Sequence, residues 1–156
     1  MPIQLYRVDD RLIHGQVVIG WGRPLGIDFI LLVDDQVRAS PWEQDLYRMG
    51  SAGIEIFFAS KAEAAETMGS WMADDRRGIL LAAEIGTMAD LRKAGVPIPR
   101  VNLGGIHHKP GRTERLPYLY LTDEELRALH DLEESGVEVS AQDLPTATPV
   151  SLRSLE

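Results

Sequence analysis

The stretch that decides the fold runs from residue 54 to residue 72, "IEIFFASKAEAAETMGSWM". It begins with a short run of β-branched and aromatic residues, as in a buried strand, and continues from Ser60 with a segment of helical length. Ser60 and Glu63 have the spacing of a capping box, in which each side chain bonds a backbone N–H group at the start of a helix. The stretch therefore predicts a strand followed directly by a helix.

The same order of strand, cap and helix recurs along the chain. "SPWE" (residues 40–43) and "TDEE" (residues 122–125) have the spacing of further capping boxes, and glycines in "MGSAG", "KAGVP" and "ESGVE" mark helix ends. This alternation predicts an α/β fold, an open and mainly parallel sheet of about seven strands with helices on both faces, in a single domain of residues 1–156. The predicted strands are Ile3 to Val8, Ile27 to Val33, Ile54 to Ala59, Gly78 to Ala82, Arg100 to Leu103, Tyr118 to Leu121 and Val137 to Val139. We expect the tail "LPTATPVSLRSLE" to form a short helix folded back on the body.

Composition narrows the function classes. The 156 residues include 16 Lys and Arg against 24 Asp and Glu, a formal net charge of -8, which argues against nucleic acid as a partner. With no cysteine, a thiol nucleophile and an Fe–S cluster are excluded, and a reducing compartment such as the cytoplasm suits the chain. Apolar runs such as "FILLV" are too short to span a bilayer, so we expect any membrane role to depend on a partner.

Two loops are expected to carry the chemistry. In an open parallel sheet, ligands bind beyond the carboxyl ends of the strands, where residues 9–16 follow the first predicted strand. His14 then lies at the start of the helix "GQVVIGW", whose free N–H groups favour an anion, and Gly15 lets backbone approach a ligand closely. The second loop, residues 104–117, is long for a compact domain, which favours a functional or a disordered segment.

Histidine at such a position has a definite chemistry, because a neutral imidazole is a nucleophile that can carry a phosphoryl group on nitrogen. Arg11 supplies a guanidinium fork matched to phosphoryl oxygens. Asp9 or Asp10 would orient Arg11 or fix the imidazole tautomer through its other nitrogen. From spacing alone, a merely solvated or capping histidine stays an alternative.

Two motifs resemble a known family. "RVDDRLIHGQV" (residues 7–17) is similar to the signature of the IIB subunits of the mannose/fructose/sorbose family of the bacterial sugar phosphotransferase system. "VNLGGIHHKPGRT" (residues 101–113) resembles their second characteristic loop, with its Asn-x-Gly-Gly opening. The order of elements, the chain length and the tail are also similar, so the resemblance covers essentially the whole chain.

The resemblance implies a protein-phosphohistidine:sugar phosphotransferase component. Its histidine accepts a phosphoryl group from a phosphohistidine of a IIA partner and passes it to a sugar held by the membrane-embedded IIC and IID subunits. His14 takes the carrier position, through Nδ1, and Arg11 that of the phosphate stabiliser, with Gly15 and Asp10 beside them. Such a protein is cytoplasmic and associates peripherally with the inner membrane through its partners. The sequence leaves open whether the chain forms a homo-oligomer, and nothing in it requires a cofactor.

The second loop departs from the family where it becomes basic. We assign a partner-docking role there, toward an acidic or phosphorylated face, to His107, His108, Lys109 and Arg112. The histidine pair has no metal-binding spacing, so no metal site is predicted. The tryptophans, Trp21, Trp42 and Trp71, are expected to pack against the sheet and not to stack on a sugar.

Two other functions stay open. Acidic pairs after the first two strands (residues 9–10 and 34–35) suggest a phospho-aspartate receiver. A receiver would also need an aspartate after the third strand and a lysine after the fifth, where this chain has Ala59-Ser60 and Gly104-Gly105. The residues Asp34 and Asp35 are instead placed at the rim of the same crevice. A regulatory module that kept the fold but lost sugar transport is the remaining alternative.

Overall fold

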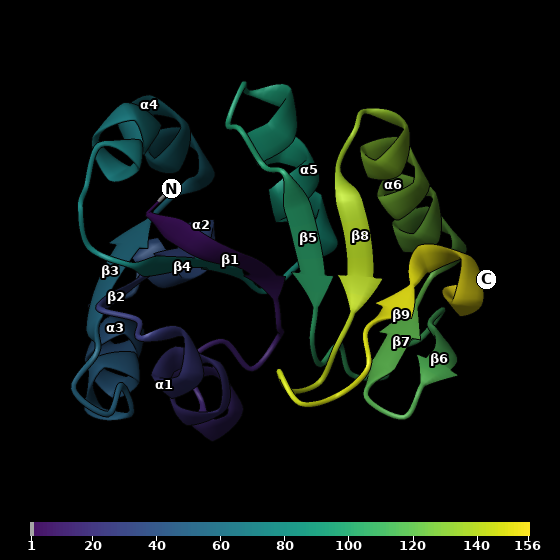
Figure 1. The fold of residues 1–156 in the computed structure, drawn as a ribbon, viewed down its shortest axis with the longest axis horizontal. Helices are drawn as coiled ribbons and strands as arrows, with labels where there is room; N and C mark the ends of the chain where they lie inside the picture. Colours follow the sequence, from purple (N-terminus) through teal and green to yellow (C-terminus); the bar gives the residue numbers. More distant parts are fainter. Residues whose placement is uncertain (1) are drawn as a thin grey trace.

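The computed structural model describes residues 2–156, so residue 1 of the predicted domain lies outside the described part. Its centre is a seven-stranded sheet in the order β3-β2-β4-β1-β5-β8-β9 (Figure 1). All neighbouring strands in it run parallel except β8 and β9, which are antiparallel. The strands are β1 (Ile3–Val8), β2 (Phe29–Val33), β3 (Glu55–Ala59), β4 (Gly78–Ala82), β5 (Arg100–Leu103), β8 (Glu138–Ala141) and β9 (Val150–Ser151). The predicted open, mainly parallel sheet is confirmed.

Helices cover both faces of this sheet (Figure 1). One face packs against α4 (Lys61–Met72), α5 (Ile85–Lys93), α6 (Asp123–Glu134) and the 3₁₀-helix η2 (Leu152–Leu155). The other face packs against the π-helix η1 (Gln16–Trp21), which continues into α1 (Gly22–Leu25), and against α2 (Asp35–Arg38) and α3 (Pro41–Met49). No helix of the described residues is long and apolar enough to cross a membrane.

Alternating strand residues build the two cores. In β2, Phe29, Leu31 and Val33 belong to the core under α4 and α5, whereas Ile30 and Leu32 belong to the core under η1. All five are completely buried, as expected for a central strand of a parallel sheet covered on both faces.

The chain reverses its direction of winding between β1 and β5. After β1 it crosses to β2, on the side of β4, whereas after β5 it crosses to β8 on the opposite side. Adjacent parallel strands whose connections leave in opposite directions form a topological switch point, where open α/β sheets bind ligands. The loops after β1 and β5 are the two that the sequence singled out.

The expectations for residues 104–121 and for the tail were partly wrong. Residues 118–121 were predicted as a strand of the main sheet, but β7 (Leu119–Leu121) pairs with β6 (Thr113–Leu116) in a separate antiparallel hairpin. The loop before it is therefore partly ordered by a strand that the polar sequence "TERL" did not reveal. In the tail, β9 precedes the single turn η2, and β9 takes the seventh place in the sheet.

Two of the three capping boxes are present. Ser60 and Glu63 form one at α4, and Thr122 and Glu125 form the other at α6. Ser40 makes no side-chain capping bond to α3, and Glu43 turns to a surface pocket instead.

The tryptophans differ in burial. Trp21 is buried, and Trp71 stacks on Phe29 with 5.3 Å between ring centroids. Trp42 is 68% exposed, so the expectation that it packs against the sheet was wrong. Helix α3 has no buried residue at all, which leaves the indole on the surface.

Candidate functional site

The site lies at the carboxyl ends of β1 and β5, where the two motif loops meet. The backbone N–H of Asp10 donates to the carbonyl oxygen of Gly105 at 2.9 Å, and that of Gly104 donates to Val8 at 2.8 Å. Segments almost a hundred residues apart in the sequence are therefore joined through their backbones.

His14 lies at the turn from the first loop into η1. The N–H groups of Val17 and Val18 both donate to its carbonyl oxygen at 3.0 Å, which fixes the turn. The loop before it includes Leu12, a buried residue with a φ of 58°, a left-handed conformation that is strained for a branched side chain. Such strain is typical of functional loops, because the surrounding packing must hold it in place.

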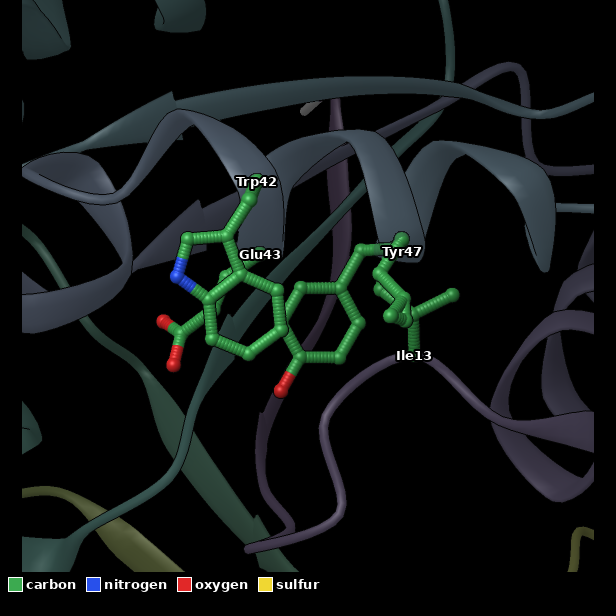
Figure 2. A pocket seen from close by; sticks show the side chains of 5 residues that line it. Ile13, Trp42, Glu43 and Tyr47 are labelled. Atoms are coloured by element: carbon green, nitrogen blue, oxygen red, sulfur yellow. The ribbon is translucent and has the colours of Figure 1, made fainter.

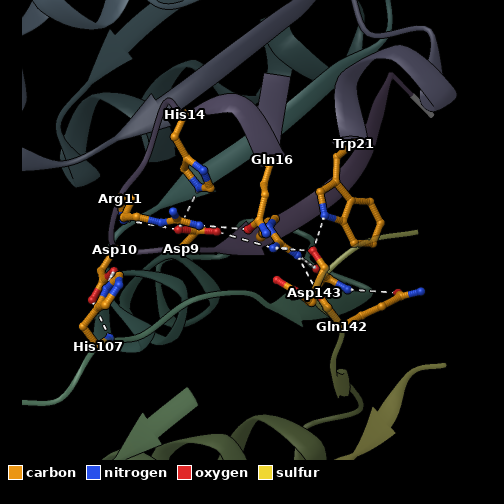
Figure 3. A network of polar contacts seen from close by, with 11 residues as sticks. Asp9, Asp10, Arg11, His14, Gln16, Trp21, His107, Gln142 and Asp143 are labelled. Atoms are coloured by element: carbon orange, nitrogen blue, oxygen red, sulfur yellow. Dashed lines mark hydrogen bonds and ion pairs between the residues drawn. The ribbon is translucent and has the colours of Figure 1, made fainter. Parts of the chain in front are cut away.

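The imidazole of His14 faces the carboxylate of Asp9 (Figure 3). Its Nε2 atom is 3.1 Å from Oδ1 of Asp9, an ion-pair distance, although the angles fall outside hydrogen-bond geometry. Asp9 is completely buried, whereas the His14 side chain is 15% exposed. Nε2 is therefore the ring nitrogen that contacts the carboxylate, whereas Nδ1 is turned away from it.

A buried arginine, Arg7, contacts the carboxylate of Asp9. Nη2 of Arg7 is 3.4 Å from Oδ2 of Asp9, and both side chains are completely buried. The guanidinium lies over the ring of Trp21, with 4.9 Å from Cζ to the ring centroid. It also donates to the side chain of Asn102 and to two carbonyl oxygens of the C-terminal segment, those of Gln142 at 2.9 Å and Asp143 at 3.1 Å.

Charge balance keeps Asp9 ionised. Burial raises the pKa of Asp9, but the contacts with His14 and Arg7 outweigh it, so that this pKa lies below its ordinary value. A carboxylate that stays ionised in a dry site stabilises positive charge on the ring beside it. The buried carboxylate of Asp9 is thus a fixed negative charge beside the His14 ring.

Arg11 and Gly15, on either side of His14 in the sequence, are both exposed. Nη2 of Arg11 donates to Oε1 of Gln16 at 2.8 Å, in an exposed contact (Figure 3). The space at Gly15 is open, because a Cβ there would meet no atom within 4 Å. The Arg11 fork is therefore accessible to an anion, and no described side chain crowds the backbone at Gly15.

Asp10 ties the first loop to the second. Its Oδ2 accepts the backbone N–H of His107 at 2.8 Å, and its Oδ1 is 2.6 Å from Nδ1 of the same residue. Arg112 links the second loop to helix α6. Its guanidinium donates to both carboxylate oxygens of Glu125 at 3.0 Å and to the carbonyl oxygen of His107 at 2.9 Å. Asp10 therefore contacts the second loop. From the sequence it was instead predicted to lie beside the phosphate.

The remaining basic groups of the second loop point outward. His108 and Lys109 are exposed, and the ring of His108 packs edge-on against Tyr120 with 5.6 Å between centroids. Their side chains are available to a partner surface, whereas the guanidinium of Arg112 is already paired.

A surface pocket of about 390 Å³ lies beside the first loop (Figure 2). It is lined by Ile13, the residue directly before His14, and by four residues of α3, Trp42, Glu43, Leu46 and Tyr47.

The sequence of residues 3–155 matches the family model of the PTS system sorbose subfamily IIB component. The chain belongs to this IIB family. Its role is accordingly that of a IIB component in the sugar phosphotransferase system, a phosphotransferase-type protein. The predicted resemblance to the IIB subunits of the mannose/fructose/sorbose family is confirmed.

Relatives match the IIB chain over nearly its full length. It is 36% identical over 160 residues to the N-acetylgalactosamine-specific phosphotransferase enzyme IIB component 2 of Escherichia coli, covering 99% of each chain. It is 26% identical to the mannose-specific EIIAB component of the same organism, covering 99% of this chain and 48% of the relative. The crystal structure of the N-acetylgalactosamine-specific IIB component 1 from Escherichia coli superposes with a TM-score of 0.90 at 28% identity, covering 96% and 98% of the two chains.

Within this IIB fold, the residues selected from the sequence fall into three groups. His14, Arg11 and Gly15 lie together at the start of η1, and Asp10 bridges to His107 in the second loop. His108, Lys109 and Arg112 lie further along that loop. Sequence reasoning missed Arg7, although a charged residue inside an otherwise apolar strand directly before the motif was a usable signal.

Proposed function

We propose that this IIB component is a phosphoryl carrier that accepts the group on Nδ1 of His14 and passes it to a sugar. The observation that carries the proposal is the contact between Nε2 of His14 and the buried carboxylate of Asp9, at a topological switch point of the sheet. This contact orients the ring so that its other nitrogen serves as the nucleophile.

In the first step, Nδ1 of His14 attacks the phosphorus of a phosphohistidine on a IIA partner. The N–P bond of the donor breaks as the new N–P bond forms, in line, so that one histidine replaces another. Asp9 favours this step because its negative charge stabilises the positive charge that the ring of His14 gains. The relative named as an EIIAB component supports a IIA donor, since its name joins the two components.

In the second step, a sugar hydroxyl attacks phosphorus and the bond to Nδ1 breaks. The hydroxyl proton passes to water, and His14 leaves as a neutral imidazole because Nε2 keeps its proton against Asp9. Protonation at Nε2 makes the ring a better leaving group than an imidazolate.

Charge on the phosphoryl oxygens is met by Arg11 and by the start of η1. At the start of η1 the N–H groups of Val17 and Val18 already donate to the carbonyl oxygen of His14, so those before them, at Gly15 and Gln16, are the ones proposed to face the anion. Arg11 exchanges its exposed contact with Gln16 for the phosphoryl oxygens when the group arrives.

We further propose that the chain works in the cytoplasm and associates with the inner membrane through IIC and IID subunits. Its second loop is the docking element in this proposal, because His107, His108 and Lys109 present basic or titratable groups to solvent next to the site. Rim charges of this kind increase the rate of association with an acidic partner, as a carrier that must release each partner requires.

The test is phosphoryl transfer from a phosphorylated IIA protein. The wild-type chain gains an acid-labile, alkali-stable phosphate, and His14→Ala gains none. Adding membranes with IIC and IID subunits then moves the phosphate to a sugar. N-acetylgalactosamine is the first sugar to test, because a relative at 36% identity is named for it.

His130→Ala is the matched control, since it removes a partly exposed histidine of α6 that pairs with Glu156 and has no part in the site or the docking loop. Labelling of His14→Ala at the wild-type level would overturn the assignment of the carrier. If the wild type is labelled but no sugar is phosphorylated, the regulatory function is favoured over sugar transport.

A further inference from the structure

Two aspartate–histidine pairs lie at the carboxyl ends of β1 and β5, and the proposed function uses only one of them. Oδ1 of Asp9 is 3.1 Å from Nε2 of His14. Oδ1 of the next residue, Asp10, is 2.6 Å from Nδ1 of His107 (Figure 3). Consecutive aspartates of the first loop therefore each contact a histidine, one in the same loop and one in the second loop.

The second pair is held at several points. The other carboxylate oxygen of Asp10, Oδ2, accepts the backbone N–H of His107 at 2.8 Å. Arg112, which is paired with Glu125, donates to the carbonyl oxygen of His107 at 2.9 Å. The backbone and one ring nitrogen of His107 are thus fixed, although its side chain is 62% exposed.

The contact with Asp10 decides which nitrogen of His107 is able to accept a proton. An ionised carboxylate accepts hydrogen bonds and donates none, so Nδ1 supplies the proton of this contact. In the neutral ring Nε2 then has a lone pair, and it has no hydrogen-bond partner among residues 2–156. An imidazole with one nitrogen held by a carboxylate and the other unoccupied has the arrangement of a general base.

His107 is also next to the proposed reaction. A Cβ on Gly105, two residues before it, would lie 3.7 Å from Oδ1 of Asp9, the same atom that contacts His14. The carbonyl oxygen of Gly105 accepts the backbone N–H of Asp10 at 2.9 Å. A membrane-embedded subunit that brings a sugar hydroxyl to the phosphorus on His14 therefore approaches the second loop as well.

We propose that His107 is the general base of the second step and that Asp10 is its positioning residue. The inference rests on the proposed function, in which the sugar remains bound to the membrane-embedded subunits. As the sugar oxygen bonds to phosphorus and the bond from phosphorus to Nδ1 of His14 breaks, the hydroxyl proton moves to Nε2 of His107. The carboxylate of Asp10 stabilises the resulting imidazolium, which then loses the proton to water.

A docking role alone does not account for the contact with Asp10. His108 and Lys109 are exposed and have no carboxylate partner among the described residues, so their charge is available to an acidic surface. The carboxylate at 2.6 Å from His107 instead offsets positive charge on its ring, which weakens attraction to an acidic partner. The same carboxylate makes the ring a stronger base.

The test measures the second step by itself, in a single turnover. The full chain is labelled at His14 by phosphorylated IIA, separated from the donor, and mixed with sugar and with membranes that contain IIC and IID. His107→Gln keeps the backbone bond to Asp10 and should be labelled at the wild-type rate. Its transfer to sugar should be about tenfold to a hundredfold slower, a modest factor for a general base because phosphoryl transfer has a loose transition state.

The dependence of this transfer on pH distinguishes a base from a structural residue. In the wild type the transfer slows as the pH falls and the ring of His107 takes up a proton, and His107→Gln lacks this part of the pH dependence. Asp10 and Arg112 are the charged groups that contact His107 among residues 2–156. Asp10→Asn, whose amide oxygen still accepts the backbone N–H, should slow the same step by a smaller factor.

Two other histidines complete the design. His108→Ala should raise the membrane concentration needed for half-maximal transfer and leave the maximal rate unchanged, as expected for a docking residue. His130→Ala, in α6, is the control for both steps.

Equal maximal rates of sugar transfer in the wild type and His107→Gln would overturn the base, even where the membrane concentration needed is higher. Slower transfer that keeps the full pH dependence would also overturn it, in favour of a structural role. A wild type that is not labelled at His14 would overturn the proposed function, and the base with it.

Discussion

Gly104 is the position where adding a single methyl group should disturb the buried support of the site. It follows β5 directly and lies over the Arg7–Asp9 pair. A Cβ on Gly104 would lie 2.3 Å from Nη2 of Arg7 and 2.7 Å from Oδ2 of Asp9, distances that no real contact reaches. The guanidinium cannot swing away freely, because it is completely buried and donates to Asn102 and to two backbone carbonyls.

The magnitude follows from two costs. Overpacking a filled interior by one methyl group costs about 1–3 kcal/mol, and breaking a buried ion pair costs about 3–5 kcal/mol. Since the pair is displaced and not removed, we expect Gly104→Ala to lower the free energy of unfolding by about 3 kcal/mol. For a chain of 156 residues this lowers Tm by about 6–12 °C.

Thermal and urea unfolding of Gly104→Ala and Gly105→Ala are the assays. A Cβ on Gly105 meets its nearest atom, Oδ1 of Asp9, at 3.7 Å, an ordinary contact, so this control should stay within about 1 kcal/mol of the wild type. In Gly104→Ala, labelling of His14 should also slow, because Asp9 moves with Arg7. Equal Tm values for the two variants would refute the reasoning that Arg7 and Asp9 fill this space rigidly.

Two further predictions concern charge. Arg11→Ala should slow phosphoryl transfer about 10²–10³-fold with little change in Tm. Gln16→Ala removes only the side-chain partner of Arg11 and should transfer the group at nearly the wild-type rate. Unfolding of Arg11→Ala would instead show that this arginine is structural. Burial raises the pKa of Glu125, but Arg112 and the backbone N–H of Thr122 outweigh it and depress the pKa below 4.5. The stability that Glu125 contributes is therefore present above pH 4.5 and lost as the pH falls through the depressed value, so urea unfolding should show the gap between wild type and Glu125→Gln closing in acid. A gap that is constant with pH would contradict this, and exposed Glu124→Gln is the control.

The parts of the fold that the sequence predicted correctly depend on local chemistry. Ser60 with Glu63, and Thr122 with Glu125, form their bonds within one turn of helix, so the pattern of four consecutive residues predicted these two capping boxes. Ser40 and Glu43 have the same spacing, but Ser40 makes no side-chain capping bond to α3. A local pattern predicts where a helix begins, and the surroundings decide whether its side-chain bonds form.

The contacts that hold Asp9 in place could not be predicted from the sequence, because they join residues that are far apart in it. Arg7 bonds Asn102, 95 residues away, and Gln142, 135 residues away. Only the order of strands in the sheet brings these residues under Asp9. The place of His14, in the loop after the first strand, was predictable, whereas the orientation of its ring depends on contacts that only the fold creates.

In the proposed function, Asp9 directs the phosphoryl group to Nδ1 of His14 by facing Nε2 at 3.1 Å. Long-range ¹H–¹⁵N NMR of the phosphorylated, ¹⁵N-labelled chain tests it directly, because the spectrum distinguishes the two ring nitrogens. We expect phosphorus on Nδ1 of His14 and a proton on Nε2. Phosphorus on Nε2, or on any other residue, would contradict the account.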